Sequence, residues 1–574
     1  MAETRFGGDL VVGALAELGI EYAAINPGAS FRGIHESLVA LGKPELILAL
    51  HENVAVAAAD GYARSAQRPM AVVLHNLVGL QSGAMGIFNA WANQSPMVVI
   101  GGSGPADAAT RRPWIDWVHS ARQQVLVARD HLKWDDQPAS LAALPDSIFR
   151  AHRIATTVPY GPTYVSVDIA LQEAELAPEQ VALLKAPAGQ ARGNALTAPP
   201  TELEDIADRL VRADNPVLVA DNTGKDKRAY DALVRLAELL AAPVVDLQAR
   251  HNFPTGHWAD CTPARSEVLA DADVVLVLDP RDLMHAIGAV DHIAHGYRPL
   301  VRPEADVICI STNQLMLRGF LDYCGPTGDA FDVLADTTEC LPVLADLVSE
   351  GAGDRQDRRK KLAAYTRTLH PAPAATVGES GEFSQPSVSR SVFEAVRHGP
   401  WELANGHMRG AVRSTWELTR FNSHLGRNVG AGLGYGIGVS IGAALAHRGD
   451  DTVIVNLQND GDLLYTPSGL WTAAKYDLPI LTVVINNRTY AQDRMHQTVT
   501  AKKRSRPLDH ASVGIDIDEP AVDFAALGRS QGVESWSPTE PDEFEKALTT
   551  AVAACRDERR PTLVEVVVPK GVQT

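Results

Sequence analysis

One stretch of the sequence constrains the fold more than any other, because two apolar strand-like runs flank a helical pattern. The run at residues 453–457 leads into Asn459-Asp460-Gly461, a helical pattern follows through residue 474, and the run at residues 480–485 leads into Asn486-Asn487. A strand–helix–strand unit of this kind forms two parallel strands with a right-handed crossover. The polar residues after both strands are therefore expected at the carboxyl edge of a sheet, where α/β proteins bind ligands.

The same alternation of strand-like and helical runs recurs along the chain and predicts an α/β fold. We expect three doubly wound parallel-sheet domains at residues 1–180, 195–345 and 380–574. The expected strands are apolar on both faces, as in covered parallel sheets, and lie at residues 22–25, 46–49, 70–74, 97–100, 163–167, 216–220, 243–247, 274–278, 306–310, 453–457, 480–485 and 562–568. Linkers are expected at residues 172–200 and 351–387, the second carrying the charged run DRQDRRKK.

The two polar clusters after the strands have the chemistry of a cation and phosphate site. Asp460 offers a carboxylate and Asn487 an amide oxygen, which suit Mg²⁺ or Ca²⁺. Gly461 would let a backbone N–H approach a phosphate without a Cβ in the way. The alternative is an ordinary turn at a strand end, since Asp-Gly and Asn-Asn are common in loops.

This arrangement resembles the diphosphate- and metal-binding motif of thiamine diphosphate enzymes, in particular the group of acetolactate synthase, pyruvate decarboxylase and benzoylformate decarboxylase. The resemblance implies that Asp460 and Asn487 are Mg²⁺ ligands and that the carbonyl of Thr489 is a third. Asn459 and Asp462 depart from the motif, where glycine and serine are usual. Asp462 either points away from the diphosphate or helps to hold the cation.

Three runs near the N-terminus resemble the pyrimidine-binding domain of the same family. They are AINPGAS (residues 24–30), LALHENVAVAAADGYAR (48–64) and VLHNLVGLQSGAMGIFNAW (73–91). The resemblance implies that Glu52 is the glutamate that bonds to the pyrimidine ring and activates the cofactor, and that Gly28 lies at the cofactor. Taken alone, Glu52 is equally a helix N-terminal acid favoured by the helix dipole.

A third run, NVGAGLGYGIGVSIGAALA from Asn428, resembles the segment that precedes the metal motif in the family. By this resemblance Leu433 holds the two cofactor rings in a V, Ala431 lies near the pyrimidine, and Gly461, Asp462 and Tyr490 contact the diphosphate side. The alternative is that Leu433 is a plain core residue. Residues 429–446 carry no charge, but six of these 18 residues are glycine, so we expect a buried loop and a tightly packed helix rather than a membrane span.

Substrate-side candidates come from the same resemblance. His75 stands where benzoylformate decarboxylase-like members carry an active-site histidine, and a neutral imidazole there could relay protons. His285 lies one residue off the spacing of a second such histidine, and Gln81 is a further candidate. Gln492 and His496 stand where aromatic-acid decarboxylases tend to be apolar, which favours a polar or anionic substrate. A basic run comprises Lys502, Lys503, Arg504 and Arg506. It either attracts an anionic substrate toward the site or is an ordinary solvated loop.

The resemblance predicts an enzyme that uses thiamine diphosphate and Mg²⁺ to make or break a C–C bond next to a carbonyl. We expect a 2-oxo acid decarboxylase or carboligase. A lyase or hydrolase of a 2-hydroxy-carbonyl or diketone compound, and an inactive regulatory subunit, are the alternatives. FAD is not expected, because residues 221–225 (DNTGK) lack the glycine cluster of a dinucleotide site. The family places Glu52 of one chain opposite Asp460 and Asn487 of another, which implies a homodimer or homotetramer with active sites between subunits.

Charge and cysteine content restrict the partners and the compartment. Lys plus Arg number 52 against 70 for Asp plus Glu, which gives a net charge of −18. Such an acidic surface repels phosphate backbones and anionic lipid, so neither nucleic acid nor membrane is expected as a partner. The five cysteines are widely spaced, without CxxC, and are expected to be reduced thiols of a cytoplasmic protein.

Overall fold

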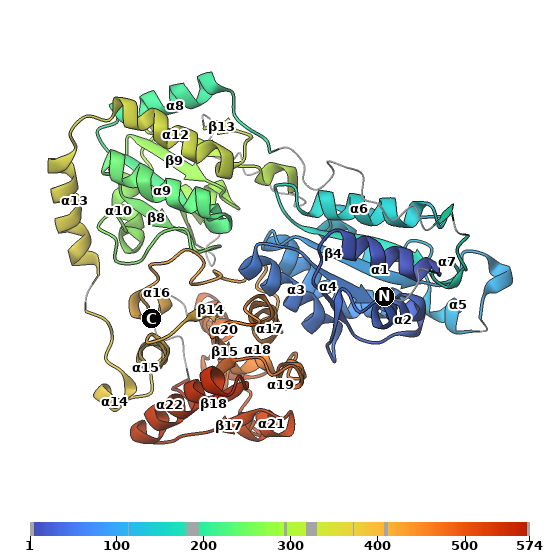
Figure 1. Ribbon diagram of the computed structural model, residues 1–574. Helices are drawn as coiled ribbons and strands as arrows, with labels where there is room; N and C mark the ends of the chain where they lie inside the picture. The colour runs from blue at the N-terminus through green and yellow to red at the C-terminus, as the bar shows by residue number, and fades with distance from the viewer. Residues whose placement is uncertain are drawn as a thin grey trace.

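The computed structural model describes residues 5–570 except residues 113, 178, 181–194, 292–295, 317–329, 371 and 407–410. Figure 1 shows three lobes: an N-terminal domain in blue and cyan, a middle domain in green and yellow, and a C-terminal domain in orange and red. Each lobe is built on a parallel sheet with helices packed against it. The predicted α/β class with three parallel-sheet domains is confirmed.

The N-terminal domain has a six-stranded sheet in the order β2-β1-β3-β4-β6-β5, with parallel pairing throughout. Its strands are β1 (Tyr22–Ile25), β2 (Glu45–Leu48), β3 (Met70–Leu74), β4 (Met97–Ser103), β5 (Trp134–Asp136) and β6 (Pro162–Asp168). Its helices are α1 (Gly7–Glu17), α2 (Arg32–Leu41), α3 (Glu52–Ala66), α4 (Asn76–Ala92), α5 (Ile115–His119), α6 (Ala143–Ala155) and α7 (Ile169–Glu173). Strands β1, β3, β4 and β6 are buried along their whole length, as in a sheet covered on both faces.

The middle domain has a five-stranded parallel sheet in the order β13-β12-β9-β7-β8 and a separate hairpin. The sheet strands are β7 (Pro216–Ala220), β8 (Val244–Asp246), β9 (Val274–Leu278), β12 (Asp306–Ile310) and β13 (Phe331–Val333). The hairpin pairs β10 (Gly288–Asp291) with β11 (Gly296–Pro299). The helices are α8 (Pro200–Arg212), α9 (Lys227–Leu240), α10 (Arg265–Ala270), α11 (Leu283–Ile287) and α12 (Thr337–Gly351).

The C-terminal domain has a five-stranded parallel sheet in the order β14-β15-β16-β18-β17. Its strands are β14 (Trp401–Gly406), β15 (Val453–Asn459), β16 (Ile480–Asn486), β17 (Glu534–Trp536) and β18 (Thr562–Val567). Its helices are α14 (Val377–Ser380), α15 (Gln385–Val396), α16 (Ala411–Thr415), α17 (Gly436–Ala446), α18 (Asp460–Leu463), α19 (Gly469–Lys475), α20 (Ala491–Lys503), α21 (Phe524–Ser530) and α22 (Pro541–Asp557).

Several edge strands were missed by the sequence patterns. Strands β5, β13 and β17 have only three residues each, too few to show a period. Strand β14 reads WELANG, and its buried Glu402 and Asn405 interrupt the apolar run that a buried parallel strand is expected to have. An edge strand pairs with one neighbouring strand only. Its residues are therefore less strictly required to be apolar than those of a central strand.

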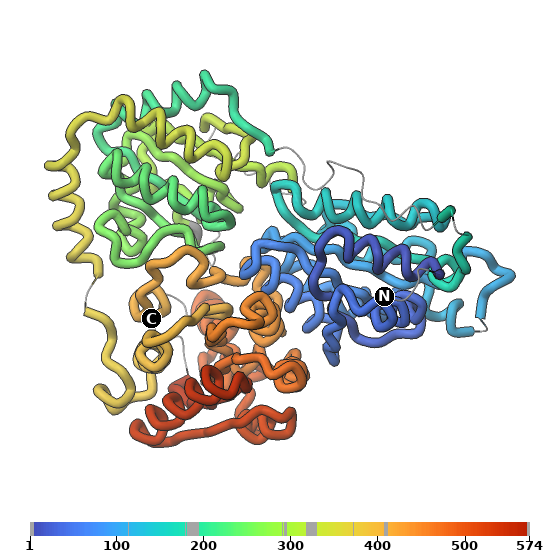
Figure 2. The backbone as a smooth tube through the Cα atoms, viewed as in Figure 1, coloured from blue at the N-terminus to red at the C-terminus, as the bar shows by residue number. Residues whose placement is uncertain are grey.

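The second predicted linker contains a helix, because most of the charged run lies in α13 (Gln356–Leu369), with Arg355 as its N-cap. Its arginines bind carbonyl groups of the middle domain: Arg355 donates to Val211 at 2.5 Å and Arg358 donates to Ala213 at 3.0 Å. Together with Leu362, which packs against the core of the middle domain, these hydrogen bonds hold a largely polar helix in place. Figure 2 shows this yellow segment along the outer edge of the molecule, from the middle to the C-terminal domain. Residues 181–194 of the first predicted linker lie outside the described residues.

Helices α3 and α17 join the N-terminal and C-terminal domains through backbone-to-backbone packing. A Cβ on Gly61 would collide with the Val439 carbonyl, and a Cβ on Gly442 would collide with the Ala58 carbonyl. Glycine therefore allows the two helices to approach more closely than any other residue would. One hydrophobic core cluster spans both helices, so the two domains share a core.

None of the helices in the described ranges is long and apolar enough to cross a membrane. The glycine-rich run instead forms the buried helix α17, as expected. Cys261, Cys309, Cys340 and Cys555 are buried free thiols, whereas Cys324 lies outside the described residues.

We expect Gly442→Ala to destabilise the protein by about 1–3 kcal/mol, because the added methyl group must push the two helices apart. The measurement is the melting temperature, compared with that of Gly353→Ala. Gly353 has open space around the position of a Cβ, so this control changes the same atoms without a collision. Equal melting temperatures for the two variants would show that the helix contact is not tight.

Candidate active site

Asp460, Asn487 and Thr489 meet at the carboxyl ends of β15 and β16, which pair in parallel. The Arg488 N–H donates to Asp460 Oδ2 at 2.7 Å, and the Thr489 N–H donates to Asn487 Oδ1 at 3.0 Å. The structure thus brings together the three residues predicted as cation ligands, on two loops joined by a hydrogen bond.

The donor set of this cluster fits a Mg²⁺ ion that carries a diphosphate. Asp460 is 3% exposed, and burial raises the pKa of its carboxyl, so a nearby cation would stabilise its charged form. No group of three His, Cys, Asp or Glu side chains able to hold a metal occurs among the residues that the structure describes. One carboxylate with amide and carbonyl oxygens leaves positions that Mg²⁺ fills with water and phosphate oxygens.

Asp462 is hydrogen-bonded to the segment that leads into α17, which favours the first of the two alternatives left by the sequence. Its Oδ1 accepts a hydrogen bond from the Gly434 N–H at 2.8 Å, and its Oδ2 accepts one from the Gly436 N–H at 3.2 Å. The carboxylate therefore serves the N-terminus of α17, where the helix dipole favours negative charge.

Buried side-chain amides support Asp462 from within the sheet. Asn405 donates to Asn456 at 2.9 Å, Asn456 donates to Gln458 at 3.0 Å, and Gln458 donates to Asp462 Oδ2 at 2.5 Å. Asn456 and Gln458 are fully buried. A satisfied buried chain of this kind fixes side-chain directions, so the Asp462 carboxylate has a single orientation.

The segment before α17 contacts both terminal domains. Ala431 has a left-handed backbone with φ 52°, and the Asn53 side-chain amide donates to the Gly434 carbonyl at 3.2 Å. Leu433 is half-buried and lines a small pocket with Ala431 and Asn459. Leu433 therefore has apolar surface at the edge of a pocket, as a residue that contacts a cofactor would.

Glu52, Gly28 and His75 follow β2, β1 and β3, which are neighbours in the N-terminal sheet. Glu52 is the first residue of α3 and is 9% exposed. Its helix is capped by His51, whose Nδ1 accepts the Asn53 N–H at 3.0 Å. The carboxyl ends of three adjacent strands thus place these candidates at one edge of the sheet.

His75 is held by a serine and faces a second histidine. Ser30 Oγ lies 2.7 Å from His75 Nδ1 and accepts the Asn76 N–H at 3.0 Å. The Ser30 hydroxyl thus holds the ring at Nδ1, which leaves Nε2 for another partner. The His119 ring lies edge-on to His75 at 5.4 Å between centroids. Burial lowers the pKa of His75, which keeps the imidazole neutral at pH 7.

The other predicted contacts lie further out. Tyr490 packs its ring against Gly461, and Gln492 contacts His496 along α20 with 2.7 Å between their side-chain nitrogens. Gln81 is exposed on α4. The basic run ends α20 and continues into the following turn, and all its members are exposed: Lys502, Lys503, Arg504 and Arg506.

Comparison with known families identifies the group to which this architecture belongs. Three domain models of the thiamine pyrophosphate enzymes match: the N-terminal TPP-binding domain at residues 5–130, the central domain at 203–318 and the C-terminal TPP-binding domain at 404–566. The chain is a member of the thiamine diphosphate-dependent enzyme family. Thiamine diphosphate is thus the cofactor of its two terminal domains, and the predicted family is confirmed.

Individual relatives of this thiamine diphosphate enzyme cover nearly its whole length. Benzoylformate decarboxylase of Pseudomonas aeruginosa is 28% identical over 91% of each chain. The acetolactate synthase large subunit of Haemophilus influenzae is 23% identical over 95% of this chain and 92% of its own. The fold is similar to that of the 4-hydroxybenzoylformate decarboxylase of Rhodococcus jostii, with a TM-score of 0.78 at 24% identity over 98% of this chain and 99% of that one.

His285 lies on α11, away from the neighbours of His75. Burial, followed by the charges of Arg265 and Arg427, lowers the pKa of His285. The charges that act on His75 are those of His119, Glu52 and Arg112. Within one chain the structure therefore does not bring the two predicted histidines together, and a catalytic role for His285 stays a prediction.

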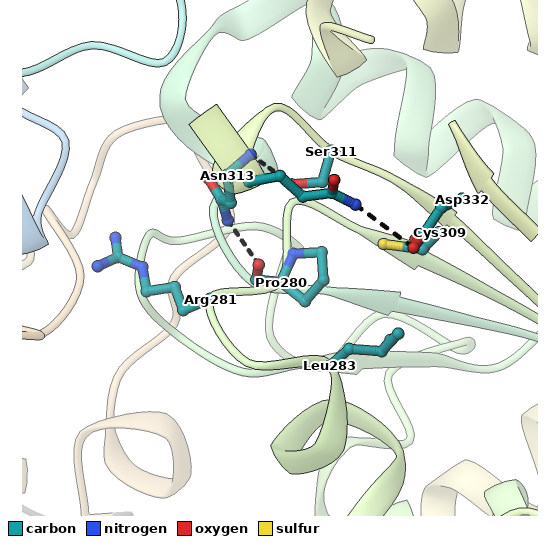
Figure 3. A pocket seen from close by; sticks show the side chains of 8 residues that line it. Pro280, Arg281, Leu283, Cys309, Ser311, Asn313 and Asp332 are labelled. Atoms are coloured by element: carbon teal, nitrogen blue, oxygen red, sulfur yellow. Dashed lines mark hydrogen bonds between the residues drawn. The ribbon is translucent and has the colours of Figure 1, made fainter. Parts of the chain in front are cut away.

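The carboxyl edge of the middle sheet holds a pocket of only about 20 Å³, between Pro280, Cys309 and Asn313. Figure 3 shows Asn313 donating to the Pro280 carbonyl across it, at 2.5 Å, while the Arg281 guanidinium points away. A space of this volume holds about one water molecule. The expectation that this thiamine diphosphate enzyme lacks FAD stays a prediction.

Two residues of the candidate site were missed by the sequence reasoning. Ser30 is the last residue of the AINPGAS run, in the loop after the predicted strand at residues 22–25, so its position after a strand end was a usable signal. His119 lies on the short helix α5, far from any expected strand end, and only the folded structure brings it to His75.

We expect Asp462→Asn to destabilise this enzyme by about 1–2 kcal/mol and to weaken retention of thiamine diphosphate. The amide of asparagine would direct an NH₂ group at one of the N–H groups that now donate to Asp462. Two donors cannot form a hydrogen bond, so at least one of these bonds is lost. The measurements are the melting temperature and the bound cofactor after dialysis. Asp451→Asn is the control, because Asp451 is exposed at the start of β15. Unchanged values for Asp462→Asn would contradict the role of this carboxylate.

Proposed function

We propose that the enzyme decarboxylates a 2-oxo acid with thiamine diphosphate and Mg²⁺. The bond between the carbonyl carbon and the carboxylate breaks, CO₂ leaves, and a proton replaces it to give an aldehyde. The observation that carries this proposal is His75, oriented by Ser30 at the same sheet edge as Glu52. The similarity to benzoylformate decarboxylase supports it.

His75 is suited to move a proton at its Nε2. Its Nδ1 is bonded to Ser30 and burial keeps the ring neutral, so Nε2 would exchange a proton with a substrate oxygen or carbon. His119 lies edge-on to the ring and narrows the directions from which substrate can approach. These two imidazoles and Ser30 would form the substrate side of the site.

Mg²⁺ would be held by the Asp460 carboxylate, the Asn487 side-chain oxygen and the Thr489 carbonyl. When bound, thiamine diphosphate supplies the electron sink that makes loss of CO₂ possible. Glu52 would bond to the pyrimidine ring from the N-terminus of α3, while Leu433 would hold the rings from the other side. Gly28, Ala431, Gly461 and Tyr490 would complete the contacts.

Carboligation is a second candidate, because an acetolactate synthase is among the relatives. Gln492 and His496, which bond to each other on the first turns of α20, are polar groups suited to a second carbonyl substrate or to an anionic one. His285 and Gln81 are further substrate-side candidates. In carboligation the acyl group that remains after loss of CO₂ would bond to a second carbonyl carbon instead of taking up a proton. The same residues would line the site for both reactions.

Active sites between two subunits are part of the proposal. Large apolar side chains of the N-terminal domain are exposed in one chain: Val78, Met85, Trp114, Trp117 and Leu126. Exposed apolar residues of this size mark interaction surfaces. We therefore assign them to contact with a second copy in a homodimer, or in a homotetramer of two such dimers, and we place this enzyme with its free thiols in the cytoplasm.

A screen of 2-oxo acids with added thiamine diphosphate and Mg²⁺ tests the reaction, with release of CO₂ and aldehyde as readout. For the best substrate, Glu52→Gln should lower kcat by about 10²–10⁴-fold while cofactor binding persists, because a proton-sharing acid is lost. Acyloin formation would identify the carboligase, and turnover of a diketone without CO₂ would identify the lyase or hydrolase instead. No turnover of any substrate would favour the regulatory subunit.

Removal of the metal tests the cation site separately. We expect Asp460→Ala to lose thiamine diphosphate during dialysis, as the unchanged protein should with excess EDTA and no added Mg²⁺. Asp451→Ala is the control, since it removes an exposed carboxylate just before the other end of β15. Normal cofactor content in Asp460→Ala would count against the assigned ligand.

A further inference from the structure

A cavity of about 350 Å³ lies between the N-terminal and middle domains. Its walls are residues that precede β1, β3 and β4, the ends of α3 and α6, and three residues of the middle domain, Lys225, Asp226 and Arg250. Helix α3 has Glu52 at its first residue and Ala63 near its last turn, in the cavity wall. The 15 residues of α3 separate its two ends by about 20 Å. The cavity is thus distinct from the cofactor site.

Arg250 is the unmatched charge in this cavity. It is 3% exposed, and its Nε and Nη1 atoms have no hydrogen-bond partner. Among the residues that the structure describes, no carboxylate pairs with it. Asp60, an acid close enough to act on it, accepts hydrogen bonds from Asn93 and Ser95 instead.

Two neighbouring arginines add further positive charge around Arg250. Burial, together with the like charges of Arg64 and Arg281, lowers the pKa of Arg250 to about 9, so it remains charged at pH 7. The terminal nitrogens of Arg64 donate to the Tyr435 hydroxyl at 2.9 Å and to the Ala249 carbonyl at 3.1 Å, whereas its Nε has no partner among the described residues. An unpaired buried charge is costly unless an opposite charge joins it.

The lysine and the other arginine of the wall are already paired. Lys225 lies 2.8 Å from Asp279 and 3.5 Å from Asp336, and Arg68 pairs with Glu21 at 2.6 Å. Asp226, the carboxylate of the wall, lies 3.5 Å from Arg228. Arg250 is therefore the arginine of the wall without a carboxylate partner in the described part of the chain. Apolar side chains complete the wall on the N-terminal side: Leu18, Ile20, Ala63, Pro69 and Pro96.

We propose that this cavity binds a small organic monocarboxylate, whose carboxylate pairs with Arg250 and whose apolar body packs against the wall of the N-terminal domain. A guanidinium presents parallel N–H groups that fit a carboxylate. The volume lies within the range of small-molecule sites. Because the walls come from two domains, occupancy links the N-terminal to the middle domain.

The test uses the full-length enzyme loaded with thiamine diphosphate and Mg²⁺, without substrate, so that its outcome does not depend on the proposed reaction. Sodium butyrate is titrated by calorimetry, with inorganic phosphate and chloride at the same ionic strength. We expect saturable binding of butyrate, weakened about tenfold or more in Arg250→Gln. Unchanged binding in Arg212→Gln is the matched control, because the Arg212 side chain is 80% exposed. Tighter binding of phosphate than of butyrate, or no binding of either, would overturn the proposal.

Two further measurements separate a ligand site from a structural role. Without added carboxylate, Arg250→Gln should melt no lower than the unchanged protein, because an unmatched buried charge is removed. A lower melting temperature would indicate that Arg250 serves only the fold. Ala63→Met keeps Arg250 and fills the cavity from α3, so it should also abolish butyrate binding, and full binding in this variant would overturn the assignment.

Discussion

The contact between α3 and α17 is the constraint on which the rest of the site depends. Two helices from different domains meet with Gly61 and Gly442 at their closest approach, where no side chain larger than a hydrogen atom fits. This contact fixes the start of α3, with Glu52, relative to the segment that leads into α17, with Leu433. The hydrogen bond from Asn53 to Gly434 extends the contact to the pocket. The start of α3 and the loop before α17, which belong to different domains of the same chain, are thereby placed in one rigid unit.

Two aspartates separated by one residue have opposite tasks, because their surroundings differ. Asp460 is buried at the junction of two loops, where its raised pKa favours a cation partner. Asp462 is surrounded by N–H donors from the α17 N-terminus and from Gln458, which satisfy its charge without a metal. An acid beside a diphosphate would be unfavourable if it faced the phosphate. The structure removes the conflict by turning the second acid toward the helix.

The two edges of the N-terminal sheet also differ in chemistry. The carboxyl edge carries Glu52, Ser30 and His75, and its imidazole is kept neutral by burial. The opposite edge faces the middle domain across a cavity with one unmatched guanidinium, that of Arg250. Neutral groups that exchange protons suit chemistry, whereas a permanent buried charge suits binding of an anion.

The sequence by itself determined the α/β class, the three parallel sheets and the strand ends that carry Asp460, Asn487, Glu52 and His75, because apolar period and strand-end position are local properties. It missed the three-residue edge strands and helix α13, whose stability comes from neighbours rather than from a pattern. Only the tertiary structure decided that Asp462 caps α17, that His119 meets His75 and that Arg250 is left without a partner. The direction of a side chain and the pairing of a charge depend on segments far apart in the chain, and these come together only when the domains pack.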